Sequence, residues 1–315
     1  MSVKISIIIP LYNKESTICP TLDSVFSQTE SEFEVIVVDD GSTDSGPLLV
    51  RAITDQRLRY YSQKNAGPGA ARNYGASLAN GKYLSFLDAD DQLEAKFIET
   101  HLKWLSEAPD CQMSVCGLTE GPDRLNNHAY FNEIGITSGQ WDVANESSPM
   151  NSIWRLAGWI CHSGAIVCQK EAFDKIAGFY DKNRCLYGED HSLWLVFLLN
   201  YKIYINSTPL MWVNTEASSL GVALQGNNPP RPILTDPSWI FARVPHTHIQ
   251  LVQKLRSRYA VLQARQCVNK WQNKNAIHFL NIAMFRGDYL CGVAREWSRM
   301  VYKFAFAAKS TGKSI

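Results

Sequence analysis

The sequence of 315 residues lacks several features that define common classes of protein. No apolar stretch reaches the roughly 18–20 residues that a membrane-spanning helix needs. Residues 1–4 lead directly into a predicted strand, so we expect no secretory signal. The eight cysteines are scattered, and none of them belongs to a Cys-x-x-Cys pair with zinc spacing. These absences argue against a membrane-spanning or a disulfide-rich secreted protein and predict a reduced, cytoplasmic one.

Two phosphate-binding fingerprints are missing as well. The chain contains neither a GxGxxG motif nor a GxxxxGK[ST] loop. Dinucleotide-dependent enzymes and P-loop proteins hold phosphates with these glycine-rich loops. The sequence therefore argues against both classes.

Acidic side chains are scarce in residues 226–315. This region holds 14 Lys and Arg but only 3 Asp and Glu, a balance of +11, whereas residues 1–225 hold 17 Lys and Arg against 27 Asp and Glu, a balance of −10. Such asymmetry indicates an acidic module followed by a basic one. We therefore divide the chain into a domain of residues 1–225 and a basic, mostly helical region of residues 226–315.

Apolar residues recur at helical spacing in the basic region, in one stripe from Leu251 to Leu262 and another from Leu290 to Phe304. Such stripes favour packing against the protein's own core or a homodimer formed through these helices. The alternative is peripheral contact with an anionic surface on the inner face of a membrane. Nucleic-acid binding is the weakest interpretation, because no basic–aromatic recognition motif accompanies the charge.

The most informative stretch that is present is YLSFLDADD at residues 83–91. An apolar run of strand length ends abruptly in Asp88, Asp90 and Asp91. Carboxylates this close repel one another, and such oxygen-rich clusters suit Mg²⁺ or Mn²⁺. The alternative is a solvated turn in which one Asp caps the following helix.

Strands and helices alternate before this stretch. Nearly continuous β-branched residues at 4–10 and 33–38 predict two buried parallel strands, and the spacing of Ile18, Leu22 and Val25 predicts a helix between them. Together these segments form a βαβ unit. The sequence thus predicts an open α/β sheet, in which ligands bind at the carboxyl ends of the strands.

Three candidate ligand-binding segments fall at such strand ends, namely residues 10–12, 39–42 and 88–91. Four ordered motifs that contain them resemble those of family 2 glycosyltransferases, the inverting, SpsA-like group. The motifs are IPLYN at 9–13, VDDGSTD at 38–44, NAGPGAARN at 65–73 and LDADD at 87–91. The resemblance continues through Gly178-Phe179 and Gly188-Glu189-Asp190 and covers roughly residues 1–220. It implies a GT-A fold, a Rossmann-like nucleotide-sugar-binding sheet flanked by helices, here with a C-terminal helical appendage.

The resemblance implies a nucleotide-sugar donor, most often a UDP-sugar. Tyr12 would stack on the uracil in a pocket that Pro10 also lines. Asp40 would accept a hydrogen bond from the imide N–H of the base, and Asp39 is the neighbour most easily confused with it. Arg72 would lie near the base or the diphosphate, and Asp88 would hold the ribose hydroxyls. The donor-binding set is Pro10, Tyr12, Asp39, Asp40, Arg72, Asp88 and Ala89.

The resemblance also assigns the metal and the base. Asp90 would bind Mn²⁺ or Mg²⁺, which stabilises a diphosphate leaving group, and Asp91 would assist or cap the next helix. Asp190 matches the general base that deprotonates an acceptor hydroxyl as its oxygen attacks the anomeric carbon. A single displacement of this kind inverts the anomeric configuration. Glu189 would contact or orient the acceptor, and helix capping is the alternative for Asp190.

The candidate acceptor residues are Trp159, His162 and His191. Core packing is an equal alternative for Trp159, and His191 is more readily a bystander. We interpret residues 109–150, which are rich in Gly, Asn and Ser, as variable acceptor-side structure. Residues 214–219 resemble a loop that folds over the diphosphate, although the His or Arg typical of the family is absent from it.

The sequence therefore predicts a metal-dependent inverting glycosyltransferase that acts on a saccharide or lipid-linked saccharide in cell-surface polysaccharide synthesis. One alternative is a nucleotidyltransferase, for which residues 10–14 make a poor phosphate-binding loop. Another is a non-catalytic nucleotide-sugar sensor, which the presence of Glu189 and Asp190 argues against.

Overall fold

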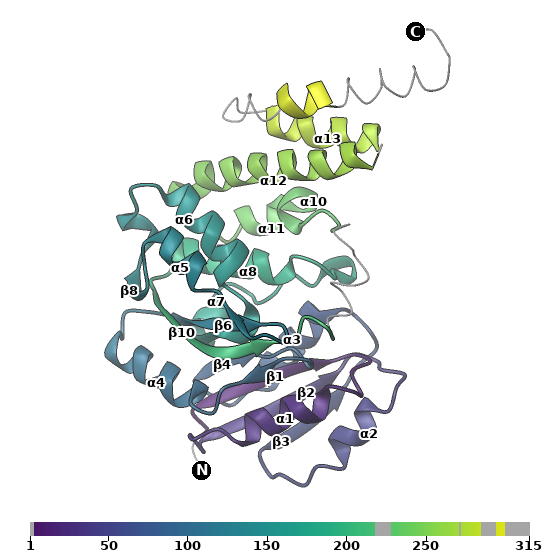
Figure 1. Cartoon of the computed structure of the whole chain (residues 1–315), viewed down its shortest axis with the longest axis vertical. Coiled ribbons are helices and arrows are strands. Elements are labelled where there is room, and N and C mark those ends of the chain that lie inside the picture. The colour runs from purple at the N-terminus through teal and green to yellow at the C-terminus, as the bar shows by residue number, and fades with distance from the viewer. Residues whose placement is uncertain (1–2, 218–227, 271, 285–293, 300–315) are drawn as a thin grey trace. The chain divides into compact units, whose positions relative to one another are not determined.

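A computed structural model describes residues 3–217, 228–270, 272–284 and 294–299 of the chain. The chain forms two compact units, Met1–Gly226 and Asn227–Ile315. In its described part, the first unit contains one ten-stranded sheet of order β3-β2-β1-β4-β9-β6-β10-β5, with β7 paired to β6 and β8 to β10 (Figure 1). The strands are β1 (Ile5–Leu11), β2 (Phe33–Asp39), β3 (Leu58–Ser62), β4 (Tyr83–Phe86), β5 (Gln92–Leu93), β6 (Met113–Glu120), β7 (Leu125–Asn126), β8 (Ser138–Trp141), β9 (Ile166–Gln169) and β10 (Ile203–Val213).

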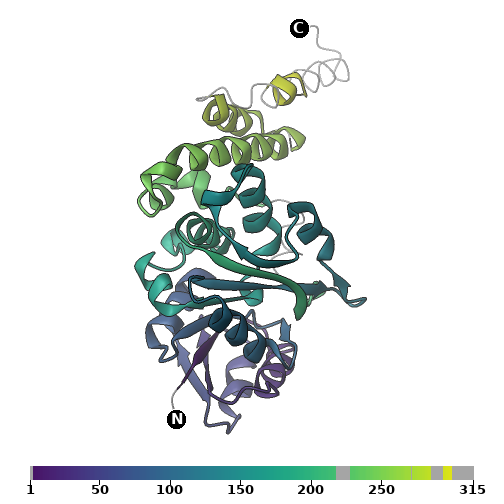
Figure 2. The ribbon, with the colours of Figure 1, turned by 90° about the vertical axis from the view of Figure 1, so that its left-hand side faces the viewer.

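Helices lie on both faces of this sheet (Figure 2). They are α1 (Ile18–Phe26), α2 (Gly46–Arg51), α3 (Pro68–Leu78), α4 (Phe97–Glu107), α5 (His128–Ile134), α6 (Pro149–Arg155), α7 (Lys170–Lys175) and α8 (Glu189–Asn200), and a π-helical turn, Leu156–Ile160, follows α6.

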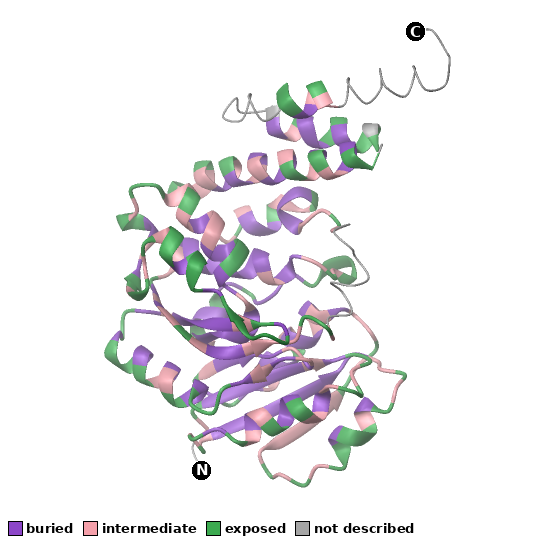
Figure 3. Cartoon of the chain, viewed as in Figure 1, coloured by how far each residue is buried: buried purple, intermediate pink, exposed green. Residues whose placement is uncertain are grey.

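The first two strands are buried on both faces, as their β-branched runs predict (Figure 3). Ile7 and Ile9 of β1 join Leu22 of α1 in one hydrophobic cluster. Ile8 faces α3 on the opposite side, where a Cβ on Gly75 would lie 2.5 Å from the Ile8 Cγ2 atom. Glycine is therefore required for α3 to pack onto β1. The predicted βαβ unit is confirmed, because β1 and β2 pair in parallel.

The segment 109–150 contributes β6, β7 and β8 to the sheet, and its predicted acceptor-side role stays a prediction. Strand β6 is buried over most of its length and pairs in parallel with β10 and antiparallel with β9. Its apolar run is interrupted by Ser114 and Gly117. Ser114 lies beside the buried ring of His101, with 2.7 Å between the hydroxyl and Nδ1. The Ser114 hydroxyl therefore has a hydrogen-bond partner inside the core. Gly117 leaves room for an irregularity in β10, because a Cβ there would lie 2.2 Å from the Ser207 carbonyl oxygen.

An aromatic cluster holds α8 against the sheet. The ring of Phe86 in β4 lies 4.8 Å from that of Phe179 and 6.3 Å from that of Trp194 in α8, measured between centroids. Such tilted and edge-to-face pairs contribute beyond the area they bury. The first turn of α8 is thereby fixed close to the turn that follows β4.

The second unit is helical in its described residues. Its helices are α10 (Pro232–Thr235), α11 (Pro237–Phe241), α12 (Ile249–Asn269) and α13 (Asn273–Met284), and residues 294–299 are also helical. Within the predicted stripe of α12, Val252, Leu255 and Tyr259 are buried, but Leu262 is 42% exposed. Of the second stripe, residues 290, 293, 301 and 304 lie outside the described residues. Among the described helices, none is long and apolar enough to cross a membrane.

Candidate active site

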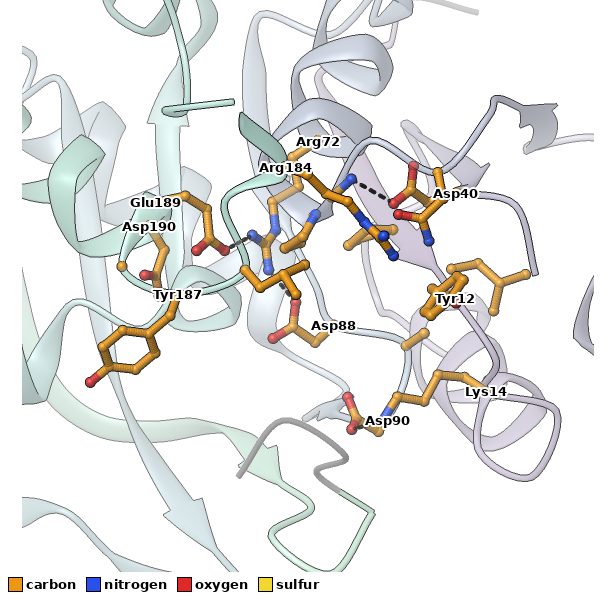
Figure 4. A pocket seen from close by; sticks show the side chains of 18 residues that line it. Tyr12, Lys14, Asp40, Arg72, Asp88, Asp90, Arg184, Tyr187, Glu189 and Asp190 are labelled. Atoms are coloured by element: carbon orange, nitrogen blue, oxygen red, sulfur yellow. Dashed lines mark hydrogen bonds and ion pairs between the residues drawn. The ribbon is translucent and has the colours of Figure 1, made fainter. Parts of the chain in front are cut away.

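A cavity of about 480 Å³ opens where β1, β2 and β4 end and α8 begins (Figure 4). This volume lies within the range of about 300–1,000 Å³ that is usual for small-molecule sites. Pro10 and Tyr12 line it from the end of β1, Asp88, Ala89 and Asp90 from the turn after β4, and Glu189 and Asp190 from α8. Residues that the sequence placed in the donor site and in the catalytic site thus share one cavity.

The loop that carries Tyr12 is tied to the loop after β2. The Asn13 N–H donates to Ser42 Oγ at 3.1 Å, and Asn13 Oδ1 accepts from the Thr43 N–H at 2.8 Å. The Glu15 N–H donates to Asp44 Oδ2 at 2.8 Å. These polar motif residues therefore hold the two loops together, and the Tyr12 ring remains 44% exposed beside the cavity.

Asp39 and Asp40 are both buried but have different roles. The Asp39 carboxylate accepts from the Ser42 N–H at 2.8 Å and from the Tyr60 hydroxyl at 3.0 Å, and Asp39 does not line the cavity. Asp40 lines it. Its Oδ1 accepts from Gln63 Nε2 and the Ala66 N–H, both at 2.8 Å, and its Oδ2 accepts from the Gly67 N–H at 2.9 Å. Asp40 therefore shapes the loop before α3 as well as the cavity wall.

Arg72 of α3 joins the two halves of the cavity. Its buried guanidinium donates from Nη2 to Asp88 Oδ1 at 2.6 Å and from Nη1 to Glu189 Oε1 at 2.9 Å (Figure 4). It also lies over the Phe179 ring, 5.2 Å from the centroid. Burial disfavours the charged guanidinium, but the two carboxylates outweigh this and raise the pKa of Arg72 above its ordinary value.

The turn after β4 concentrates negative charge. Burial opposes the charged form of Asp88, yet Arg72 holds the pKa of its carboxyl below the usual value. Burial and the charge of Asp88 raise the pKa of Asp90, and burial with the charges of Asp88 and Asp90 raises that of Asp91 well above its ordinary value. Lys14 Nζ lies 2.5 Å from Asp90 Oδ2 and offsets part of this repulsion.

The chemistry of these side chains fits a divalent cation. One ligand atom from each of Asp88, Asp91 and His162 lies within 4.8 Å of the others, and Asp90 belongs to the same turn. Hard cations such as Mg²⁺ and Mn²⁺ prefer oxygen ligands, and mutual repulsion among these carboxylates is relieved by added positive charge. His162, which sequence reasoning placed on the acceptor side, therefore lies beside the acidic turn.

The first turn of α8 presents the two carboxylates of the predicted catalytic pair. Gly188 is the residue that precedes the helix, with a left-handed φ of 80°, so Asp190 does not cap it. The Asp190 carboxylate accepts from the His191 N–H at 2.6 Å. Burial and the charge of Asp190 raise the pKa of Glu189 to about 7, against the opposing effect of Arg72.

The other two acceptor candidates lie away from the cavity wall formed by the described residues. Trp159 is 44% exposed and packs on Tyr130, with 5.3 Å between ring centroids. His191 is buried within α8. Their acceptor roles stay predictions.

Sequence reasoning did not select two cationic residues that line the cavity, Lys14 and Arg184. Lys14 directly follows the IPLYN motif at a strand end, and this position was a usable signal. Arg184 follows Asn183 in a turn where both residues adopt left-handed backbone angles, with φ of 51° and 56°. No sequence pattern marks that turn, and strained residues of this kind often occur at functional sites.

Comparison with known proteins defines the class. Residues 6–176 match the family model "Glycosyl transferase family 2", which covers more than half of the chain. The chain is 41% identical over 219 residues to the glycosyltransferase GlyA of Streptococcus pneumoniae serotype 4, a match that covers 67% of the chain and 29% of GlyA. The protein belongs to glycosyltransferase family 2.

Solved structures agree on the fold. TarS of S. aureus, residues 1–349 in complex with UDP-GlcNAc, has a TM-score of 0.69 at 19% identity, over 99% of this chain and 93% of that one. The mannosyltransferase PcManGT from Pyrobaculum calidifontis, in complex with GDP-Man and Mn²⁺, has a TM-score of 0.57 at 18% identity, over 98% and 81%. The fold is GT-A with a helical C-terminal region, as predicted. The chain spans 15% to 29% of the length of four curated relatives that it matches, GlyA included.

The raised pKa of Glu189 makes a testable contribution to stability. Between its ordinary pKa of 4.5 and its folded pKa of about 7, the folded protein holds a proton that the unfolded chain releases. The free energy of unfolding should therefore fall as pH rises through this window, by up to about 3 kcal/mol. Glu189→Gln removes this dependence, so the free energy of unfolding of the variant relative to that of wild type should rise by up to about 3 kcal/mol between pH 4.5 and pH 8, measured by urea unfolding.

The control for that series is Glu107→Gln, which changes an exposed glutamate on α4. A constant stability difference between Glu189→Gln and wild type across the pH range would show that burial does not raise the pKa of Glu189.

Proposed function

We propose that the protein transfers a sugar from a UDP-sugar to an acceptor hydroxyl with inversion of the anomeric configuration. The observation that carries this proposal is the shared cavity. Tyr12 and Asp40 line one end, the acidic turn lies between, and Asp190 lines the other end (Figure 4). This order matches the order of base, diphosphate and sugar in a nucleotide-sugar. Membership of glycosyltransferase family 2 favours this activity over nucleotidyl transfer.

The base end suits uracil. The exposed Tyr12 ring offers a stacking surface, and stacking on an aromatic ring contributes about 1–3 kcal/mol per base. A carboxylate oxygen has two acceptor sites. Among the described residues, Asp40 Oδ1 accepts two hydrogen bonds but Oδ2 only one. Asp40 Oδ2 therefore retains capacity to accept the imide N–H of uracil.

A divalent cation, Mn²⁺ or Mg²⁺, belongs to the proposal. Asp90 would hold it, and Asp88, Asp91 and His162, whose ligand atoms lie within 4.8 Å of one another, would be further donors. When bound, the cation would supply Lewis-acid stabilisation to the negative charge that grows on the diphosphate. The presence of Mn²⁺ in PcManGT, a protein of the same fold, supports this assignment.

The chemical step then requires one base. Asp190 takes the proton of the acceptor hydroxyl as that oxygen bonds to the anomeric carbon, while the bond from this carbon to the diphosphate oxygen breaks and UDP leaves. Asp190 suits this role better than Glu189 because Glu189 is already paired with Arg72 at 2.9 Å. Glu189 instead fixes Arg72 beside the acidic turn and contacts the acceptor.

Replacement of the base separates an enzyme from a binding protein. Asp190→Asn should slow UDP release from UDP-sugars by about 10²- to 10⁴-fold, the usual effect of losing a general base. UDP affinity, measured by calorimetry, should stay within about threefold of wild type because Asp190 lies at the sugar end. Asp123→Asn, at an exposed loop position, is the control. Turnover near the wild-type rate in Asp190→Asn would reject Asp190 as the base.

We further propose that α12 contacts an anionic membrane surface on the cytoplasmic side, where a lipid-linked saccharide for cell-surface polysaccharide synthesis would be the acceptor. This helix contains no Asp or Glu, and its exposed side chains include Lys254, Arg265 and the apolar Leu262. Cations beside an exposed leucine suit an anionic interface, since each basic residue contributes about 1 kcal/mol there.

Vesicle sedimentation tests this contact. The wild-type protein should bind vesicles that contain phosphatidylglycerol more tightly than vesicles of phosphatidylcholine alone. The double variant Lys254→Glu/Arg265→Glu should bind the anionic vesicles at least about thirtyfold more weakly than wild type. The matched control Lys64→Glu/Lys96→Glu reverses two exposed lysines of the first unit. Equal losses in both double variants, or none in either, would contradict a contact through α12.

A further inference from the structure

Lys14 occupies a position that the mechanism has not used. Its ammonium lies in the cavity wall, 2.5 Å from Asp90 Oδ2, and donates to the Ala217 carbonyl oxygen at 2.7 Å. Both charged side chains are largely buried, with exposed fractions of 15% for Lys14 and 12% for Asp90. A pair in this position is screened by solvent much less than a surface pair.

The contact with Ala217 makes this arrangement more than a single ion pair. The Asn214 N–H donates to Asp91 Oδ1 at 3.0 Å, and the Ala217 N–H donates to Asn214 Oδ1 at 3.2 Å. The segment that leaves β10 is thus tied to the acidic turn at both ends, once directly and once through Lys14. This network holds the Lys14 ammonium at Asp90.

We propose that Lys14 is a built-in counter-cation of Asp90, which competes with the divalent cation for that carboxylate. This inference rests on the proposed function, because it concerns the cation that the proposed reaction uses. Since Asp90 cannot give the same oxygen fully to both cations, a divalent ion must displace the ammonium or share the carboxylate with it. Metal affinity in the donor-free protein is therefore lower than the carboxylates alone would allow.

The displaced ammonium would have a second position, beside the diphosphate. Lysine has three N–H donors on a flexible stem, and Lys14 already lines the cavity. Once the divalent ion takes Asp90, the ammonium is free to turn toward the negatively charged diphosphate. Loss of Lys14 should therefore strengthen metal binding and weaken nucleotide binding.

The test measures Mn²⁺ binding to the free protein by electron paramagnetic resonance, in which only unbound Mn²⁺ gives the sharp six-line signal. Lys14→Met should bind Mn²⁺ about tenfold more tightly than wild type, equivalent to about 1.4 kcal/mol. Lys14→Arg keeps a cation and should stay close to wild type. Lys64→Met removes the same charge from an exposed position and corrects for the general electrostatic effect. Thermal melting of each variant checks that it is folded.

Two results would overturn the inference. The first is Mn²⁺ binding by Lys14→Met that is no tighter than that of Lys64→Met. The second is the absence of Mn²⁺ binding in every variant and in wild type. UDP titrations of the same samples separate failure of this inference from failure of the proposed function. If UDP binds but Mn²⁺ affinity is the same in Lys14→Met and Lys64→Met, only the role of Lys14 is rejected. If neither UDP nor Mn²⁺ binds, the donor site is rejected as well.

Discussion

The site depends on one buried guanidinium. Arg72 lies between Asp88 and Glu189, which come from segments that are far apart in the chain. A buried charge is tolerated only when it is paired, and removal of one partner of such a pair costs about 3–5 kcal/mol. The two ion pairs and the Phe179 ring together fix α3, the turn after β4 and α8 in one arrangement. The residues that we propose to bind the donor and the proposed base are therefore held at a fixed separation before any ligand arrives.

Glycines and one further carboxylate also position these groups. Gly75 lets α3 pack on β1, which sets the depth of Arg72. The left-handed Gly188 starts α8 so that Glu189 and Asp190 point into the cavity. The Asp40 carboxylate binds the loop that precedes α3. A substitution of Gly75 or Gly188 would therefore change the geometry of the site without removing a group that is proposed to touch a ligand.

Sequence reasoning predicted the strands with continuous apolar runs and the site segments at their carboxyl ends, because burial on two faces leaves a strong signal. It missed β6, in which Ser114 and Gly117 interrupt the run and are accommodated only by partners distant in sequence. It distinguished poorly between neighbours such as Asp39 and Asp40, since only the fold determines which carboxylate faces the cavity. The position of Lys14 directly after the IPLYN motif was a usable signal, whereas no sequence pattern marks Arg184, which the tertiary structure brings to the cavity.

The proposed function requires this cavity to bind UDP together with a divalent cation. Isothermal titration of UDP, GDP and CDP, each with and without Mn²⁺, tests it most directly. We expect UDP to bind most tightly of the three and Mn²⁺ to improve its affinity by about tenfold or more, because the cation would neutralise charge shared by the diphosphate and the acidic turn. Failure of all three nucleotides to bind in the presence of Mn²⁺ would contradict the proposed function.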